Sequence, residues 1–226
     1  MVIIEKKLIV FGGKLTEDES VLDEMWQFHT VSSSWENVQY SMSFENATRL
    51  QSENKESSLS LVGHSATVVD FKNGTVIMLV MFGYHPVMEL APFIYEYNVA
   101  SKTWSKPETD GYSPKGLYEH TAVYDPSTYT VYIHGGFPVA TKTNILSSST
   151  LAYNVQNRKF TRLADSSVGR YLHGAAIWDN VMFVFGGSTY THKEETECSS
   201  CFAANTMAYS IKNDRLANRY YTFSEY

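Results

Sequence analysis

The sequence predicts an all-β fold that consists of four copies of one unit. Short runs of valine, isoleucine, tyrosine and phenylalanine alternate with glycine, asparagine, serine and proline, a pattern typical of strands and turns. Four of these runs end in glycine, and the first glycines lie 71, 52 and 51 residues apart. The glycines are Gly12 and Gly13, Gly83, Gly135 and Gly136, and Gly186 and Gly187.

A second repeat follows the glycine in each unit. An aromatic residue is followed seven positions later by a second bulky residue. A period near 50 residues with these two features is typical of a kelch-type β-propeller, in which each blade is a four-stranded sheet. We therefore expect a partial propeller of about four blades. The bulky pairs are Phe28 and Trp35, Tyr97 and Trp104, Tyr153 and Phe160, and Tyr209 and Leu216.

The repeat also sets the expected boundaries inside one kelch-repeat segment, 1–226. The first blade is expected to lack its opening strand, because the chain enters an apolar run at Lys7. Residues 39–62 are rich in serine, asparagine and glutamate, so we expect an exposed inter-blade loop there. Blades are expected at about 7–38, 63–107, 118–163 and 170–217, with a divergent tail at 218–226.

The repeated residues have expected structural roles. Glycine after a strand lets the backbone reach positive φ and turn tightly. The paired rings are expected to fill the space between neighbouring sheets, where each large ring can bury roughly 150–250 Å². Burial of Trp104 should therefore make a large contribution to stability.

Composition limits the classes of partner. The chain is 43% hydrophobic, which is enough for a core, and its net charge is −6. An acidic balance argues against a nucleic-acid partner, because such binding needs a basic surface. No run of 18 apolar residues is present, so we expect no direct membrane insertion by this segment.

Three histidines, His64, His120 and His173, recur at the start of three units. Three histidines can bind a metal, but their equal positions in successive blades spread them around the fold, so we expect structural roles. No nucleophile elbow, phosphate-binding glycine loop or His-Glu-x-x-His motif occurs. We expect no catalytic residue, no metal, no cofactor and no enzymatic activity.

Two further features bear on the cellular compartment. Cys198 and Cys201 are compatible with reduced thiols, with a loop disulfide, or with half a zinc site or a redox dithiol. N-glycosylation sequons begin at Asn46, in the expected loop, and at Asn73, in an expected hairpin turn. Both asparagines are expected to be exposed.

Several segments carry a more specific pattern than the glycine doublets: 63–69, 82–86, 119–121, 131–137, 170–173, 185–187, 201–202 and 207–211. These segments resemble the attractin family, large extracellular glycoproteins with kelch modules, and the resemblance covers roughly residues 7 to 215. In the second unit Tyr84 is interpreted as a replacement of the usual second glycine, as in that family. A cysteine that the family tends to place at 212–214 is absent here.

Three functions follow from the repeat and the resemblance. The first is a non-catalytic protein-interaction module of an extracellular, attractin-like membrane or secreted glycoprotein that acts in cell-surface interaction or signalling. The second is an intracellular, cytoplasmic kelch adaptor that recruits ubiquitin-ligase substrates or binds actin. The third is a propeller enzyme such as a copper oxidase or a sialidase. We expect protein partners, and the remaining blades of a longer chain among them.

Overall fold

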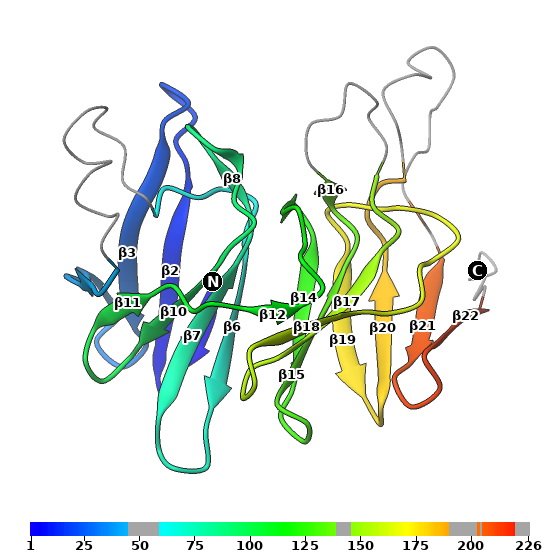
Figure 1. Cartoon of the computed structure of the whole chain (residues 1–226). Coiled ribbons are helices and arrows are strands. Elements are labelled where there is room, and N and C mark those ends of the chain that lie inside the picture. The colour runs from blue at the N-terminus through cyan, green and yellow to red at the C-terminus, as the bar shows by residue number, and fades with distance from the viewer. Residues whose placement is uncertain (45–58, 139–145, 190–202, 204, 220–226) are drawn as a thin grey trace. The chain divides into compact units, whose positions relative to one another are not determined.

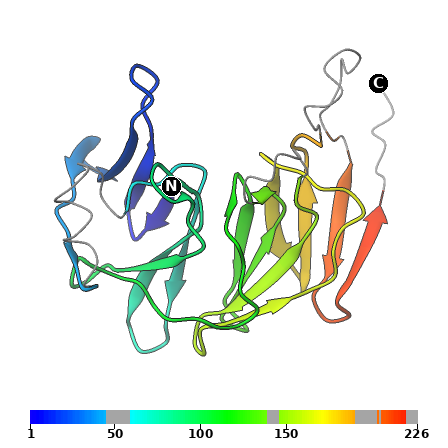
Figure 2. The ribbon, with the colours of Figure 1, turned by 45° about the horizontal axis from the view of Figure 1, so that its top comes forward.

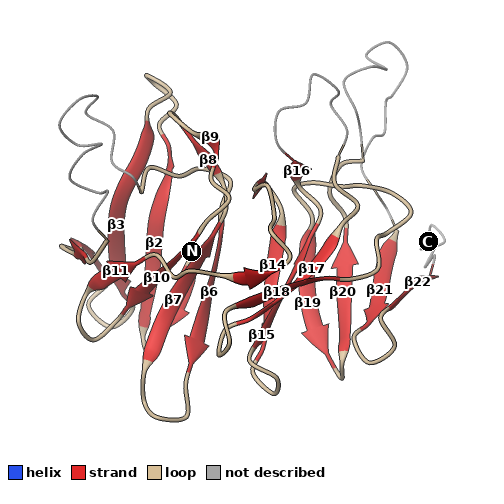
Figure 3. Cartoon of the chain, viewed as in Figure 1, coloured by secondary structure: helices blue, strands red, loops and turns tan. Residues whose placement is uncertain are grey.

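The structure is a computed structural model that describes residues 1–44, 59–138, 146–189, 203 and 205–219. These residues form strands, turns and loops and contain no helix (Figure 3). This part of the chain accordingly contains no helix that is long and apolar enough to cross a membrane. The chain divides into two compact units, Met1–Glu108 and Thr109–Tyr226, and each unit contains two of the expected sheets (Figure 1). The all-β architecture is confirmed.

The sheet of blade one has four antiparallel strands in sequential order. The expectation that this blade lacks its opening strand is wrong, because β1 pairs with β2. The strand gave little sequence signal: it has three residues, and its turn contains Glu5 at a φ of 56° instead of glycine or asparagine. The strands are β1 (Val2–Ile4), β2 (Lys7–Lys14), β3 (Val21–His29) and β4 (Ser34–Asn37).

Blade two has the same antiparallel order, β6-β7-β10-β11, and a fifth short strand, β5, which lies parallel to β11 at the outer edge. The strands are β5 (Ser41–Met42), β6 (Ser65–Asp70), β7 (Val76–Met81), β10 (Ile94–Asn98) and β11 (Thr103–Ser105), with a small hairpin of β8 (Tyr84–His85) and β9 (Glu89–Leu90).

The prediction of an exposed loop at 39–62 is therefore partly wrong. Its start forms β5, and Leu59 and Leu61 near its end have no exposed surface. Residues 45–58 lie outside the described part. The apolar residues at both ends of this segment explain the difference, because they pack against the core of blades one and two.

Blades three and four form the second unit. Blade three repeats the extra outer strand, since β12 lies parallel to β18. In blade four β22 reaches residue 219, so the tail begins later than the expected 218. The strands are β12 (Asp110–Gly111), β13 (Leu117–Tyr118), β14 (Thr121–Asp125), β15 (Thr130–His134), β16 (Phe137–Pro138), β17 (Thr150–Asn154), β18 (Lys159–Arg162), β19 (Gly174–Trp178), β20 (Val181–Phe185), β21 (Thr206–Ser210) and β22 (Arg215–Arg219).

Within each unit the two sheets pack face to face (Figure 2). The first strands lie beside each other, β1 beside β6 in one unit and β14 beside β19 in the other. In the first unit Phe11 of blade one packs on Trp104 of blade two, with ring centroids 4.7 Å apart. In the second unit Tyr132 of blade three and Tyr209 of blade four lie 6.5 Å apart. Each core is thus a layer of side chains between consecutive sheets.

We expect Trp104→Ala to lower the free energy of unfolding by about 3–5 kcal/mol, because the indole has no exposed surface and its removal opens a large cavity. Urea unfolding measures the change. Trp35→Ala is the matched control: Trp35 holds the same repeat position but is 54% exposed, so its loss should cost less than about 1 kcal/mol. Equal losses in both variants would contradict the packing described here.

Candidate interaction surfaces

Within each unit, the second blade meets the first glycine of the first blade's doublet. Gly12 and Gly135 have φ values of 63° and 69°. A Cβ atom at Gly12 would lie 2.6 Å from the carbonyl oxygen of Leu61, and one at Gly135 would lie 2.4 Å from that of Arg170. The next amides donate to the same oxygens, Gly13 to Leu61 at 2.8 Å and Gly136 to Arg170 at 2.7 Å. Glycine is required at Gly12 and Gly135 because the segment that leads into the following blade lies against their backbone and leaves no room for a side chain.

The second glycine of each doublet lies against the histidine at the start of its own blade. Added Cβ atoms at Gly83, Gly136 and Gly187 would lie 2.9, 2.8 and 2.7 Å from the Cβ atoms of His64, His120 and His173, respectively.

Gly83 is therefore the second glycine, and Phe82, with a φ of 56°, holds the place of the first. The interpretation that Tyr84 replaces the second glycine is wrong by one position. An aromatic residue in the left-handed region is uncommon, so the sequence gave no reason to place Phe82 there.

Gly186 is the first glycine of blade four, and an added Cβ atom there would meet no described atom within 4 Å. Its φ of 67° nearly equals the 63° of Gly12, so alanine meets the same backbone strain at both positions. We expect Gly12→Ala to destabilise the protein by about 1–3 kcal/mol more than Gly186→Ala, because of these two glycines only Gly12 faces a second blade in the described part of the chain. Denaturation curves of the two variants measure the difference, and equal losses would argue against the close contact between Gly12 and the following blade.

His64 and His173 lie where the two blades of their own unit meet. The His64 ring contacts Phe11 edge-on at 5.5 Å, and the His173 ring contacts His134 in the same way at 5.6 Å. His173 Nε2 is hydrogen-bonded to Thr121 Oγ1 at 2.8 Å. His120, at the start of blade three, is also buried. The described ranges contain no group of three histidine, cysteine, aspartate or glutamate side chains that could hold a metal ion.

Burial sets the charge state of these histidines. It lowers the pKa of His64 and of His173 to about 4, and that of His134 to about 3. The nearby positive charge of Arg170 acts in the same direction on His134 and His173. The guanidinium of Arg170 is itself buried and donates to the Gly186 carbonyl at 3.0 Å. The three rings are therefore uncharged at neutral pH.

This charge state predicts acid sensitivity. The unfolded chain regains a histidine pKa of about 6.5, so it binds protons before the folded state does as the pH falls. Stability should be complete above about pH 6.5 and fall toward pH 4, by up to about 1.4 kcal/mol per pH unit for each histidine.

The test is His134→Phe, which places in blade three the ring that blade one has at Phe11. We expect the loss of stability between pH 7 and pH 5 to shrink by about 1–2 kcal/mol in this variant. Denaturation curves at both pH values measure it. Removal of the bond to Thr150 Oγ1 (3.0 Å) should lower stability equally at both pH values, so an unchanged pH dependence would contradict the assignment.

The ring pairs keep similar centroid separations whether they are buried or exposed. The centroids are 5.1 Å apart in Phe28–Trp35 and in Tyr97–Trp104, and 4.7 Å apart in Tyr153–Phe160. Trp104, Tyr97, Tyr153 and Phe160 are buried, and Trp35 is exposed. Tyr209 pairs across strands with Leu216, so this blade lacks the second ring. A hollow of about 270 Å³ lies beside Tyr209 between blades three and four.

Two sheet faces carry exposed apolar residues. On blade one, Trp26 and Trp35 lie on the face opposite to Phe11 and Met25. On blade four, Trp178 and Phe185 lie on the face opposite to Met182 and Val184. Contiguous exposed apolar surface on a soluble domain is typical of an interaction site.

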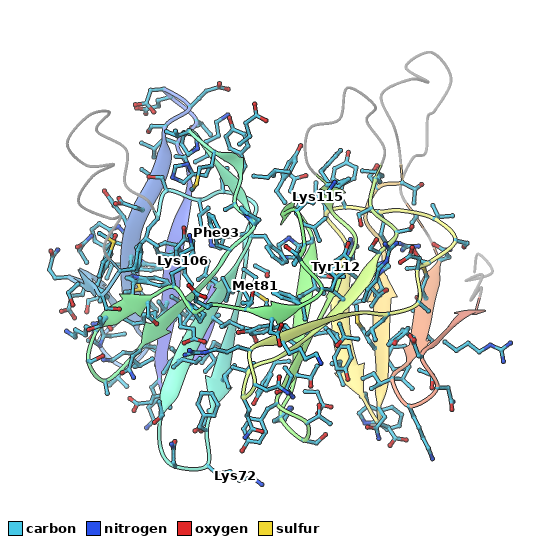
Figure 4. All side chains as sticks on the ribbon, viewed as in Figure 1. Lys72, Met81, Phe93, Lys106, Tyr112 and Lys115 are labelled. Atoms are coloured by element: carbon cyan, nitrogen blue, oxygen red, sulfur yellow. The ribbon has the colours of Figure 1, made fainter. Side chains whose placement is uncertain are left out.

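The modification candidates are only partly described. Asn73 is exposed in the β6–β7 turn, where its Oδ1 accepts a hydrogen bond from the Thr75 amide at 3.0 Å. Lys72, its neighbour, lies at the tip of this turn in Figure 4. Asn46, Cys198 and Cys201 lie outside the described residues. The glycosylation sites and the state of the cysteines stay predictions.

Repeated four-stranded antiparallel sheets that meet at conformationally required glycines are typical of a β-propeller protein. The chain belongs to the Attractin/LZTR1 beta-propeller family, whose model matches residues 1–223. It is 27% identical over 207 residues to "Putative protein tag-53" of Caenorhabditis elegans, which covers 87% of this chain and 14% of that protein.

Two other relatives show how widely the repeat occurs. The chain is 30% identical over 132 residues to "Multiple epidermal growth factor-like domains protein 8" of Mus musculus, covering 57% of this chain and 5% of that protein. It is 27% identical over 127 residues to "Leucine-zipper-like transcriptional regulator 1 homolog" of Drosophila melanogaster, covering 54% and 12%. The chain thus spans a small part of the length of these relatives.

Proposed function

We propose that this chain is a non-catalytic protein-interaction module of a longer, extracellular attractin-like glycoprotein or receptor. The observation that carries the proposal is the exposed aromatic surface of a propeller whose described residues contain no converging metal-ligand cluster. Large rings on a sheet face gain free energy when a second protein surface removes them from water. Copper at stoichiometric amount in the native protein would contradict a non-catalytic role.

The remaining blades of a longer chain are proposed partners of the two open faces. In the first unit Trp104 is buried because it packs on Phe11 of the preceding blade. Trp35 has the same position in blade one and is exposed among the described residues. A further blade on each open face would extend the same packing.

The extracellular assignment rests on the attractin resemblance and on the exposed sequon at Asn73. The second candidate is an intracellular adaptor, which the similarity to the Leucine-zipper-like transcriptional regulator 1 homolog favours. The two candidates differ in whether the protein passes through the secretory pathway, where N-glycans are attached.

We expect Asn73 of the native protein to carry an N-glycan, because its turn is exposed and its sequon is intact. Enzymatic deglycosylation in heavy-oxygen water, followed by mass spectrometry, should convert Asn73 to labelled aspartate. Asn180 is the internal control: it lies exposed in the β19–β20 turn but is followed by Val181-Met182, so it should stay unlabelled. An unmodified Asn73 together with a cytosolic protein would favour the adaptor.

A further inference from the structure

Three aromatic rings lie in contact where blade three meets blade four. Tyr118 of β13 pairs across strands with Phe137 of β16, and their rings stack with centroids 4.9 Å apart. The Phe137 ring also contacts the ring of Tyr171, from the segment that leads into blade four, at 4.6 Å. All three rings are partly exposed. The cluster is built entirely within the second unit.

The same pair of positions recurs in each of the last three blades, with fewer rings in blades two and four. Each pair joins the residue two positions before the repeated histidine to the residue directly after the second glycine. Among these three blades, blade three has a ring at both positions. The pairs are Val62 and Tyr84, Tyr118 and Phe137, and Tyr171 and Ser188.

The residue directly before each repeated histidine has a left-handed backbone. Gly63, Glu119 and Leu172 hold this position, with φ values of 65°, 56° and 52°. Glycine adopts such values without strain, whereas glutamate and leucine do so at a cost in free energy. Leu172 is also 67% exposed, and its amide donates to the Glu119 carbonyl at 3.2 Å. The second unit thus presents a carboxylate and an apolar side chain together from strained backbone, a feature that clusters at binding sites.

The Glu119 carboxylate lies beside the rings without a cation. Burial raises the pKa of Glu119. Burial, followed by the charge of Glu119 and the phenol of Tyr171, raises the pKa of Tyr118, so these three polar groups lie near one another. No lysine, arginine or histidine of the described residues forms an ion pair with Glu119. The carboxylate is therefore partly desolvated and lacks an opposite charge in this part of the chain.

The second unit also shows what a carboxylate and a ring bind when they lie together. The guanidinium of Arg162 donates to Asp165 Oδ2 at 2.7 Å. Its central carbon lies 5.9 Å from the centroid of the Tyr112 ring, which Figure 4 labels. One arginine thus forms a charge-assisted hydrogen bond and a cation–π contact. Glu119 and Tyr118 offer the same two groups, and no arginine of the described residues lies on them.

We propose that the surface formed by Tyr118, Glu119, Tyr171 and Leu172 binds an arginine side chain of a partner protein. The guanidinium forms two parallel hydrogen bonds with the Glu119 carboxylate and stacks on the adjacent tyrosine ring. The aliphatic stem of the arginine covers Leu172. The inference rests on the proposed interaction function and specifies the surface and the group that it recognises.

Charge favours a partner protein over a second copy of this chain as the source of the arginine. The chain has a net charge of −6, so two copies repel each other, whereas a basic partner is attracted. Within the second unit, Arg162 and Arg170 are already bound, to Asp165 and to the Gly186 carbonyl. Arginine is favoured over lysine because its planar guanidinium meets a carboxylate with two donors and stacks on a ring.

The probe is N-acetyl-arginine amide, titrated into the whole chain at low salt and followed by amide NMR. Shifts should change at Tyr118 to His120 and at Tyr171 and Leu172. N-acetyl-citrulline amide has nearly the same shape but no charge, so it should bind at least about fivefold more weakly. N-acetyl-lysine amide keeps the charge without the planar group and should also bind more weakly than the arginine probe.

The protein variants separate this surface from general attraction of a cation to an acidic protein. Glu119→Gln should weaken binding of the arginine probe at least about fivefold. Glu89→Gln is the matched control, because Glu89 is exposed and has a similar φ of 61° but lies in the β8–β9 hairpin of the first unit, so binding should be unchanged. Tyr171→Val introduces the residue that blade two has at Val62 and should weaken binding at least about threefold.

Stability measurements show whether a cation of this chain already occupies the surface. A carboxylate with a raised pKa in the folded state opposes folding when it is ionised, so Glu119→Gln should keep or raise the urea midpoint at pH 7. A lower midpoint for Glu119→Gln, with Glu89→Gln unchanged, would mean that the carboxylate is already paired.

Three results would overturn the proposal. The first is equal binding of the arginine probe and of the citrulline or lysine probe. The second is the lower midpoint of Glu119→Gln. The third is a concentration-dependent dimer with shifts at Tyr118 to His120, which would make a second copy the occupant. The N-glycan at Asn73 is measured separately, so with glycan present each of these results would reject this surface and leave the extracellular module standing.

Discussion

The close approach of one blade's entry backbone to the preceding blade's first glycine is the constraint on which the rest of each unit depends. At Gly12 and Gly135 a carbonyl oxygen of the next blade occupies the space of a side chain, and the neighbouring amide donates to that oxygen. This contact fixes the separation of the two sheets at one end. The separation then determines what fits between them, such as the edge-on ring of His64 on Phe11 or of His173 on His134.

The ring pairs show which part of the repeat is local and which part needs a neighbour. Phe28–Trp35 and Tyr97–Trp104 have the same centroid separation, although Trp104 is buried and Trp35 is exposed. Cross-strand register alone therefore sets the geometry of the pair. Burial, and with it most of the stabilisation, comes from the adjacent sheet.

The sequence predicted what depends on this short-range pattern. Glycines after strands, hairpins and paired bulky residues recur in each unit, so the four sheets and the family could be predicted from the sequence. Strand β1 was missed because three apolar residues and a turn at Glu5 carry no periodic signal. Phe82 was misplaced because its left-handed backbone depends on its tertiary surroundings rather than on its own preference.

The covering strands, β5 and β12, were missed for a different physical reason. Strand β5 pairs with β11 through only two residue pairs, and Ser41 lies 62 positions before its partner Thr103 in the sequence. No hairpin turn joins the two strands. A strand lies at the edge of a sheet when no other strand pairs with its outer side. The sequence of the strand itself does not indicate whether such a partner exists. Trp35 was expected to fill the space between sheets as the second ring of its pair, and only the structure shows that it is exposed.

The covering strands bear on how such a sheet avoids unwanted association. An open strand with adjacent apolar side chains is a template for pairing with other chains. Blades two and three are protected because a segment of the same chain pairs with their outer strands. In both blades this segment precedes the blade in the sequence, and in blade two its rings also pack on the sheet, Tyr40 on Trp104 and Phe44 on Tyr95. Backbone pairing and side-chain packing therefore close this edge together.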